Sequence, residues 1–291
     1  MKYRPKLSKY GYYVADPKPT KDEIKKYYEE EFYQKPKVYI NDSSLEVKER
    51  DHDFYKFWYR FYVDLIPINK NFQPNSLLDL GCGYGHFLSY VKNNSNIDAL
   101  IGVEPFPDFL KFVEPLGIKG YVSTLESFTK KSKNKFDVVT MINVLEHINN
   151  PEKVLSNISK NILNEGGSLI LQVPNDFNII QEIAVKKNSI KKWWFAPPIH
   201  VSYFSPNSLK KLLKQCGFNK IKIYCTFPID MFLLMNRDYI SHPELGRQAH
   251  LDRFNFEQAF VKTNKIKELK KIYQSFARAG IGREIICLAK T

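Results

Sequence analysis

Short apolar segments alternate with amphipathic segments over much of this 291-residue chain, and this alternation restricts the possible folds more than any other feature. The apolar segments have the length of strands and contain few polar residues, which is typical of strands buried on both faces of a parallel sheet. The segments between them have helical spacing. We therefore predict an α/β fold with a doubly wound, mostly parallel sheet. Seven strands are predicted, at residues 76–80, 99–104, 120–123, 136–142, 167–174, 220–227 and 283–289.

A glycine-rich loop follows the first of these strands, in the sequence LLDLGCGYGHFL at residues 77–88. It is one residue shorter than the Gly-x-Gly-x-x-Gly loop that holds a dinucleotide pyrophosphate, and it lacks the Gly-Lys-Ser/Thr of a Walker loop. The loop therefore predicts a ligand without a phosphate that comes close to the backbone. S-adenosylmethionine fits, because Asp79 suits its ammonium group. Glu104, at the end of the second strand, can accept hydrogen bonds from both ribose hydroxyls.

Four segments of the chain resemble motifs of the class I S-adenosylmethionine-dependent methyltransferases, namely LLDLGCGYGHFL, IGVEPF, FDVVTMINVLEHINNP and LNEGGSLILQVPN. The resemblance covers residues 76–227 and implies a Rossmann-like methyltransferase fold with S-adenosyl-L-methionine as cofactor. It places the glycine loop at the methionine moiety, Thr124 and Leu125 near adenine, and Asn143 beside the sulfonium. The implied cofactor-binding residues are Asp79, Gly81, Cys82, Gly83, Gly85, Glu104, Pro105, Thr124, Leu125 and Asn143.

Two later segments are similar to methyltransferases that act on small molecules. The segment HVSYFSPNSLKKLLKQCGF at 200–218 resembles the ubiquinone-type branch, and ARAGIGREIICLAK at 277–290 is similar to enzymes of surface-polysaccharide and sugar-nucleotide pathways. The resemblance thus implies methyl transfer to a sugar or sugar nucleotide of surface-polysaccharide biosynthesis. A quinone-like or phosphoramidate acceptor is the alternative within the enzyme class. A noncatalytic binding or scaffold subunit is the alternative outside it, because a fold alone does not fix a function.

Two histidines are the candidate catalytic residues. If the cofactor occupies the ends of the first two strands, the acceptor must approach from the fourth and fifth. His147 lies at the end of the fourth strand and His200 follows the fifth, and a neutral imidazole can accept a proton from the acceptor. Trp193 and Trp194 either wall the acceptor site or pack on the sheet. No paired carboxylates follow the fifth strand, and we predict no metal site.

The chain is predicted to have a methyltransferase core with two additions. Residues 1–70 are expected to form an N-terminal helical extension or lid, in which Thr20 and Glu23 predict the start of a helix. The core is expected at 71–227 and 281–291. Residues 228–280 form a long connection between the last two strands, which predicts an inserted lid that recognises the acceptor.

The composition excludes several other classes of protein. The net charge is +13, but the lysines are scattered on helix faces, so we predict no nucleic-acid binding. The sequence NVLEHI also stands where nucleic-acid amino-methyltransferases have Asn/Asp-Pro-Pro-Tyr/Phe. The chain lacks an apolar run that could span a membrane, an apolar signal core and Cys-x-x-Cys spacing, so a cytoplasmic protein is expected. The predicted partner is a small-molecule acceptor, and no pattern specifies an oligomeric state.

Overall fold

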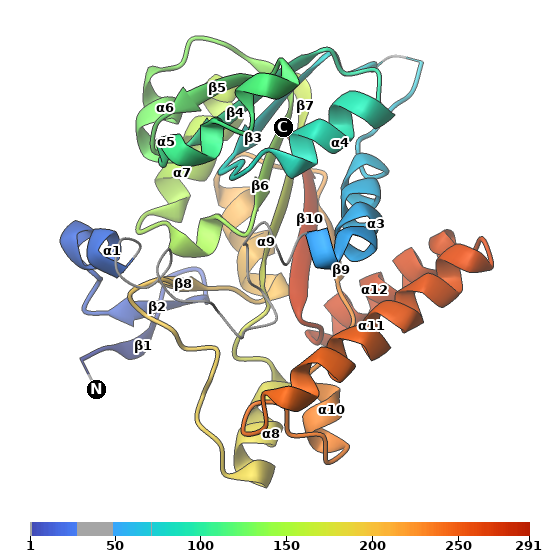
Figure 1. Cartoon of the computed structure of the whole chain (residues 1–291). Helices are drawn as coiled ribbons and strands as arrows, with labels where there is room; N and C mark the ends of the chain where they lie inside the picture. The colour runs from blue at the N-terminus through green and yellow to red at the C-terminus, as the bar shows by residue number, and fades with distance from the viewer. Residues whose placement is uncertain (1, 28–48, 71) are drawn as a thin grey trace.

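A seven-stranded sheet forms the centre of the protein (Figure 1). The computed structural model describes residues 2–27, 49–70 and 72–291. The strands lie in the order β5-β4-β3-β6-β7-β10-β9. Strand β10 runs in the opposite direction to the other six, so the sheet is mostly parallel, as predicted. The strands are β3 (Ser76–Leu80), β4 (Ala99–Glu104), β5 (Lys119–Val122), β6 (Phe136–Ile142), β7 (Leu163–Pro174), β9 (Lys222–Cys225) and β10 (Glu284–Lys290).

Helices cover both faces of this sheet. The helices that follow α1 (Lys21–Tyr27) among the described residues are α3 (His52–Val63), α4 (His86–Asn94), α5 (Pro107–Leu110), α6 (Leu125–Lys131), α7 (Pro151–Asn157), α8 (Ile179–Asn188), α9 (Pro206–Gln215), α10 (Met231–Leu234), α11 (Glu244–Lys262) and α12 (Ile266–Ala279). Helices α8 and α10 pack on each other beyond one end of the sheet (Figure 1). Three short turns of other helix types complete them, η2 (Glu114–Leu116), η3 (Leu145–His147) and η4 (Ile158–Ile162). Among the described helices, none has the length and apolar character needed to cross a membrane.

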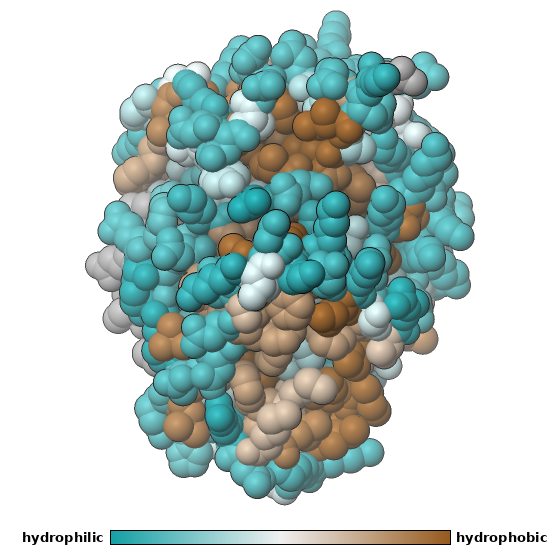
Figure 2. Space-filling view, turned by 90° about the vertical axis from the view of Figure 1, so that its right-hand side faces the viewer, coloured by the Kyte–Doolittle hydropathy of each residue, from teal (hydrophilic) through white to brown (hydrophobic). Residues whose placement is uncertain are grey.

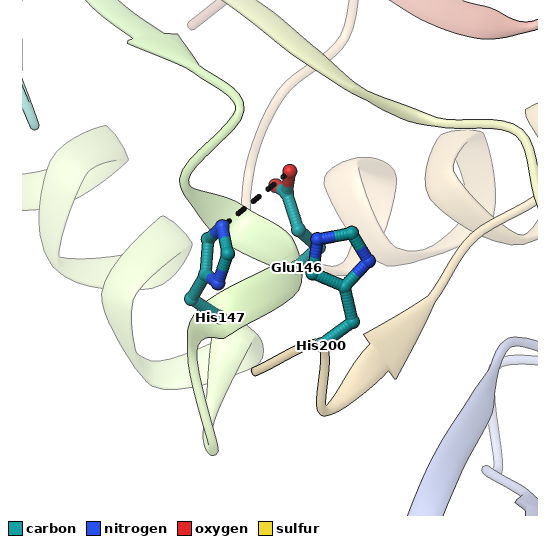
Figure 3. A group of neighbouring side chains, drawn as sticks. All are labelled: Glu146, His147 and His200. Atoms are coloured by element: carbon teal, nitrogen blue, oxygen red, sulfur yellow. Dashed lines mark ion pairs between the residues drawn. The ribbon is translucent and has the colours of Figure 1, made fainter. Parts of the chain in front are cut away.

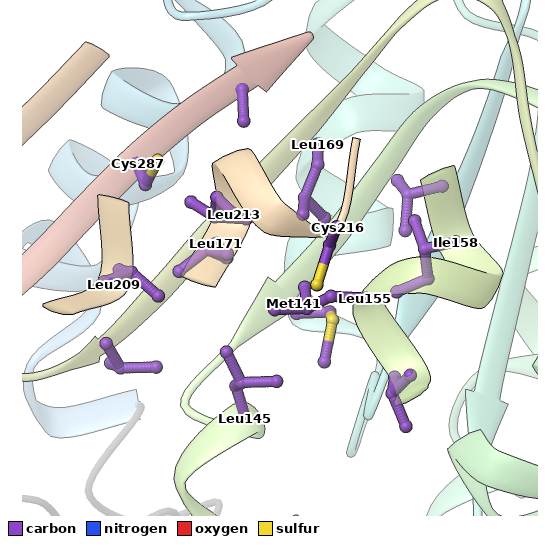
Figure 4. Close-up of a cluster of buried hydrophobic side chains, with 14 of the residues drawn as sticks. Met141, Leu145, Leu155, Ile158, Leu169, Leu171, Leu209, Leu213, Cys216 and Cys287 are labelled. Carbon is purple, nitrogen blue, oxygen red and sulfur yellow. The ribbon is translucent and has the colours of Figure 1, made fainter. Parts of the chain in front are cut away.

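Alternate residues of each strand enter opposite cores, which explains the nearly continuous apolar runs in the sequence. On β7, Leu169 and Leu171 pack with helices α6, α7 and α9, whereas Ile170 between them packs with α3, α4 and α12. Successive side chains of a strand point to opposite faces, so a sheet with helices on both sides needs apolar residues at every position. Figure 4 shows part of the first core, where Met141 and Leu155 lie close to Leu169.

The N-terminal segment differs from the predicted helical extension, because it begins with strands. β1 (Arg4–Leu7) and β2 (Tyr13–Asp16) form a hairpin, and β2 pairs with β8 (Ser202–Tyr203) in a second, three-stranded sheet. These strands are only two to four residues long, and β8 pairs from nearly two hundred residues away, so no local pattern shows them. The predicted helix is present as α1 (Lys21–Tyr27), with Thr20 and Glu23 bonded reciprocally. Its predicted continuation beyond residue 27 lies outside the described residues.

The connection between β9 and β10 folds into helices α10, α11 and α12. Helix α12 contributes the fully buried Leu269 and Tyr273 to the core around α3. Tyr273 stacks on Trp58 of α3, with ring centroids 6.1 Å apart. The apolar stripe of α3 therefore packs against the insertion and the sheet. The side of the molecule that carries these helices has hydrophilic borders, with a hydrophobic patch in its upper half and a broader apolar area in its lower half (Figure 2).

Candidate active site

The glycine loop has a backbone that only glycine adopts easily. Gly81, Gly83 and Gly85 have φ of 79°, 51° and 74°, in the left-handed region that side chains disfavour. A Cβ on Gly81 would lie 2.5 Å from Cγ2 of Val144, and one on Gly85 would lie 2.8 Å from Cγ2 of Val113. A Cβ on Gly83 would meet no atom within 4 Å. Gly81 and Gly85 thus hold the loop against its neighbours, while the backbone at Gly83 has open space beside it.

Asp79 and Glu104 lie beside the loop at the ends of adjacent strands. Strands β3 and β4 pair in parallel, which places the two strand ends at the same edge of the sheet. Glu104 accepts a hydrogen bond from the Gly83 amide at 3.1 Å, and Asp79 accepts one from the Thr140 hydroxyl at 2.6 Å. Both carboxylates are buried. The two acids are therefore held in fixed positions around the glycine loop, as the sequence predicts for a cofactor site.

Burial sets the ionisation of groups around this loop. It raises the pKa of Glu104 from 4.5 to about 7, against the opposing effect of the Gly83 and Phe106 amides. Burial also raises the pKa of the Cys82 thiol, whose side chain lies against Gly102 on β4. The Cys82 side chain therefore packs against β4 as a thiol.

The remaining predicted cofactor residues lie at the ends of the next strands. Thr124 is the N-cap of α6 and accepts a hydrogen bond from the Ser127 amide, and Leu125 is buried in the first turn. The adjoining Ser123 amide donates to the Glu104 carbonyl at 3.1 Å, which brings the start of α6 to the end of β4. Pro105 directly follows Glu104 and is half-buried. These residues therefore extend the site along one edge of the sheet.

Asn143 belongs to a polar group that sequence reasoning found only in part. It has φ of 56°, an uncommon conformation for a residue other than glycine, at the end of β6. Its Oδ1 accepts a hydrogen bond from Gln172 Nε2 at 3.1 Å, and Tyr62 donates its hydroxyl to Gln172 Oε1. Gln172 carried a signal, since it is an amide side chain within the apolar run LILQV at 169–173. Tyr62 did not, because it lies on a helix rich in aromatic residues.

The two candidate catalytic histidines lie next to each other (Figure 3). Their rings are 5.0 Å apart between centroids, and the carboxylate of Glu146 lies between them with Oε1 3.7 Å from His147 Nε2. His147 and Glu146 come from η3, after β6, whereas His200 comes from the loop before β8. The Val201 amide donates to the Glu146 carbonyl at 2.8 Å and joins the two segments. Sequence reasoning found both histidines but missed Glu146, although it directly precedes His147.

The ionisation of this group also follows from burial. Burial lowers the pKa of His147 to about 4, against the carbonyls of Ile199 and Asn143, and lowers the pKa of His200 well below its usual 6.5. Burial raises the pKa of Glu146 well above 4.5, and the carboxyl groups of Glu284 and Asp176 raise it further. Both imidazoles are thus neutral at neutral pH.

A second set of charged side chains lies close to Glu146 and was not predicted. Arg283 has Asp176, Asp230 and Glu284 around it, and these carboxylates raise its pKa although burial opposes its charge. Asp176 follows β7, Glu284 begins β10, and Asp230 comes from the insertion, where Tyr239 donates to it at 2.6 Å. Three carboxyl groups therefore gather around one guanidinium, and two of them, those of Asp176 and Glu284, also act on Glu146.

The aromatic residues before His200 take part in packing. Trp194 and Tyr203 are buried, and both rings make edge contacts with Phe177. The Tyr203 hydroxyl donates to the His200 carbonyl at 2.6 Å. These aromatics therefore hold the loop that carries His200. The histidines of the insertion lie in other surroundings, His250 beside Arg253 and His242 in an exposed pair with Glu244.

Comparison with known proteins identifies relatives of this arrangement. The family model described as "Methyltransferase domain" matches residues 50–223. The chain is 30% identical over 161 residues to the ubiquinone biosynthesis O-methyltransferase of Glaesserella parasuis serovar 5 (strain SH0165), with 47% of this chain and 66% of that protein covered. The match thus spans slightly less than two thirds of that relative.

Solved structures show the same fold at low identity. A SAM-dependent methyltransferase from Archaeoglobus fulgidus matches with a TM-score of 0.55 and 18% identity, covering 86% of this chain and all of that one. The plantazolicin methyltransferase BamL, solved with a triazolic desmethylPZN analog and SAH, matches with a TM-score of 0.53 and 14% identity, covering 93% and 95%. At these identities the likeness concerns the fold.

Proposed function

Because this chain belongs to the methyltransferase-domain family and uses S-adenosylmethionine as its cofactor, we propose that it methylates a hydroxyl group of a small molecule. The observation that carries the proposal is the single edge of the sheet that joins the Gly83 loop and Glu104 to the group of Glu146, His147 and His200. The glycine loop and Glu104 suit the cofactor, and the group of three side chains suits the acceptor. A sugar or sugar nucleotide is the first acceptor class, as the C-terminal resemblance implies.

In the proposed cofactor complex, Glu104 accepts hydrogen bonds from the two ribose hydroxyls. The open backbone at Gly83 lies along the methionine moiety, with Asp79, Gly81, Cys82 and Gly85 forming the rest of that wall. Pro105, Thr124 and Leu125 border the adenosine, and Asn143 lies beside the sulfonium. These assignments rest on the burial and hydrogen bonds of Asp79 and Glu104 at adjacent strand ends.

The proposed reaction is an in-line displacement. The acceptor oxygen forms a bond to the methyl carbon while the bond from that carbon to sulfur breaks, and the electron pair returns to sulfur, leaving S-adenosylhomocysteine. The acceptor loses its hydroxyl proton, and His200 with His147 is positioned to promote that loss. Holding the two reactants in line supplies roughly 7–11 kcal/mol in favourable cases. The insertion at 228–280 is proposed to close the acceptor side, since Asp230 and Tyr239 reach Arg283.

A quinone-like phenol is the second acceptor class. The similarity to a ubiquinone biosynthesis O-methyltransferase favours it. A panel of nucleotide-activated sugars, free sugars and catechol-like phenols, incubated with S-adenosylmethionine, separates the two classes. Product is detected as a mass increase of one methylene group, together with release of S-adenosylhomocysteine.

Calorimetry with S-adenosylmethionine alone tests the enzyme class. Binding is expected, and its absence would leave the noncatalytic scaffold as the better reading. A loss of binding on replacement of Glu104 would tie the cofactor to the predicted strand end.

A further inference from the structure

We propose that Glu146, His147 and His200 form a binding site for a divalent transition-metal ion. The side-chain oxygen and nitrogen atoms that can act as ligands all lie within 4.8 Å of one another. Around a tetrahedral zinc ion with ligands at about 2.1 Å, neighbouring ligand atoms are about 3.4 Å apart. The Glu146 Oε1 and His147 Nε2 atoms are already 3.7 Å apart. Small rotations of the side chains therefore bring the three ligands into the geometry of a zinc site (Figure 3).

Glu146 has no counter-charge close to it in the described part of the chain. Its side chain is only 3% exposed, and among the described residues its Oε2 atom has no hydrogen-bond partner. A buried carboxyl group without a counter-charge stays protonated, and it ionises when it is paired with a cation or binds a metal. The neighbouring Asp176 and Glu284 add negative charge, with Arg283 as the counter-charge that faces them. A divalent cation beside Glu146 would balance this group.

The surrounding backbone orients the histidines as ligands. The Nδ1 atom of His147 lies 3.1 Å from the carbonyl oxygen of Ile199. The Asn143 carbonyl also interacts with this ring, and the Nε2 atom lies 3.7 Å from Glu146 Oε1. Metal-bound histidines usually have a backbone carbonyl of this kind behind them, which fixes the ring. The His200 amide donates to the Ala196 carbonyl, and the Tyr203 hydroxyl donates to the His200 carbonyl. The site is thus preorganised from both segments.

The ligand set indicates the class of metal. Two imidazoles and one carboxylate suit zinc, iron, cobalt or nickel, whereas magnesium and calcium prefer oxygen ligands. Zinc is the first candidate, because three protein ligands leave an open position for a substrate oxygen. This role deepens the proposed function and rests on it, since the open position would hold the acceptor hydroxyl and ease the loss of its proton to solvent. Binding of the metal itself can be measured without any acceptor.

The test uses the untagged full chain after dialysis against a chelator. When Zn²⁺ is added back, we expect one ion per chain, measured by calorimetry and by elemental analysis after the excess ion is removed. Co²⁺, as a probe, should give visible absorption bands with the intensity of a four- or five-coordinate site. Glu146→Gln and His200→Ala should each weaken Zn²⁺ binding by at least about 100-fold, since loss of even an outer partner lowers affinity 10–100-fold.

His242→Ala is the matched control, because His242 forms an exposed pair with Glu244, 3.3 Å apart, that has the same two residue types. It should bind Zn²⁺ as the wild type does. Circular dichroism and melting identify any variant that fails to fold, and His200→Ala, at a half-buried loop position, keeps the test decisive if Glu146→Gln unfolds. The absence of Zn²⁺ and Co²⁺ binding by the folded wild type, or equal binding by folded His200→Ala, would overturn the proposal.

The proposed function and the metal site can fail separately. Methyl transfer that is unchanged after chelation, together with the absence of Zn²⁺ binding, would refute the metal site and leave the methyltransferase function standing. One bound Zn²⁺ that depends on His200, with no methyl transfer to any acceptor class, would leave the site standing and refute the acceptor assignment.

Discussion

Replacement of Glu104 by glutamine should make the cofactor-free protein more stable and the cofactor complex weaker. Glu104 is 6% exposed, and burial raises its pKa from 4.5 to about 7. In the unfolded chain this group ionises near 4.5, but in the folded protein it ionises near 7. The free energy of unfolding therefore falls as the pH rises from 4.5 to 7, and above 7 the loss is complete.

The size of the effect follows from the same two values. Each pH unit between them corresponds to 1.36 kcal/mol, so ionised Glu104 lowers the free energy of unfolding by about 3 kcal/mol at pH 8. In the wild type, Glu104 accepts hydrogen bonds from the Gly83 amide and, at 3.4 Å, from the Phe106 amide. Glutamine is neutral and keeps one oxygen for the Gly83 amide, but its NH₂ group would face the Phe106 amide and lose that bond. We expect a net gain of about 1–3 kcal/mol at pH 8 and a much smaller one at pH 5.

Cofactor binding should change in the opposite direction. The ribose hydroxyls donate hydrogen bonds, and bonds to a charged acceptor contribute about 1.5–3 kcal/mol each. Glu104→Gln should weaken S-adenosylmethionine binding at pH 8 by roughly 10–150-fold. In the wild type the affinity should rise with pH up to about 7, where Glu104 becomes ionised. In the variant it should be independent of pH over that range.

Urea unfolding at pH 5 and pH 8 and calorimetric titration with S-adenosylmethionine measure the two effects. Asp108→Asn serves as control, because Asp108 is an exposed acid just after the same strand, paired with Lys111, and surface changes stay within about 0.5 kcal/mol. A variant that is less stable than the wild type at pH 8 would refute the burial argument. Unchanged cofactor affinity would refute the ribose assignment.

Three further perturbations test other parts of the site. His200→Ala and His200→Gln should each lower turnover by about 10²–10⁴-fold while S-adenosylmethionine affinity stays within a few-fold, and near-normal turnover in both would remove His200 from the chemistry. Gly81→Ala should destabilise the protein by about 1–3 kcal/mol, because its φ is 79° and the new Cβ would lie 2.5 Å from Val144, and urea unfolding equal to wild type would contradict this. Limited proteolysis should cut within residues 228–265 before the core and release no folded fragment, since α12 is anchored by Leu269; a stable excised domain would show the insertion to be independent.

Local pattern was sufficient to predict the sheet, the glycine loop and the two acids beside it. Strands buried on both faces must be apolar at consecutive positions, so their positions could be read from the residues, and Ala99–Glu104 and Phe136–Ile142 begin and end where predicted. The left-handed backbone at Gly81, Gly83 and Gly85 restricts these positions to glycine, so the loop also has a local signature. Asp79 and Glu104 could then be placed because parallel strands end at the same edge.

Contacts between distant segments were decided only by the tertiary structure. Nothing local in the sequence indicates that His200 comes to rest 5.0 Å from His147, that Glu146 lies between them, or that Tyr62 reaches Gln172. The pairing of β2 with β8, which turns part of the expected helical extension into a second sheet, has the same origin. Periodicity reports which face of a segment is buried, whereas the partner of that face depends on how all the segments pack together. The glycine loop and its two acids were therefore readable from the chain, and the group of Glu146, His147 and His200 formed only when the chain folded.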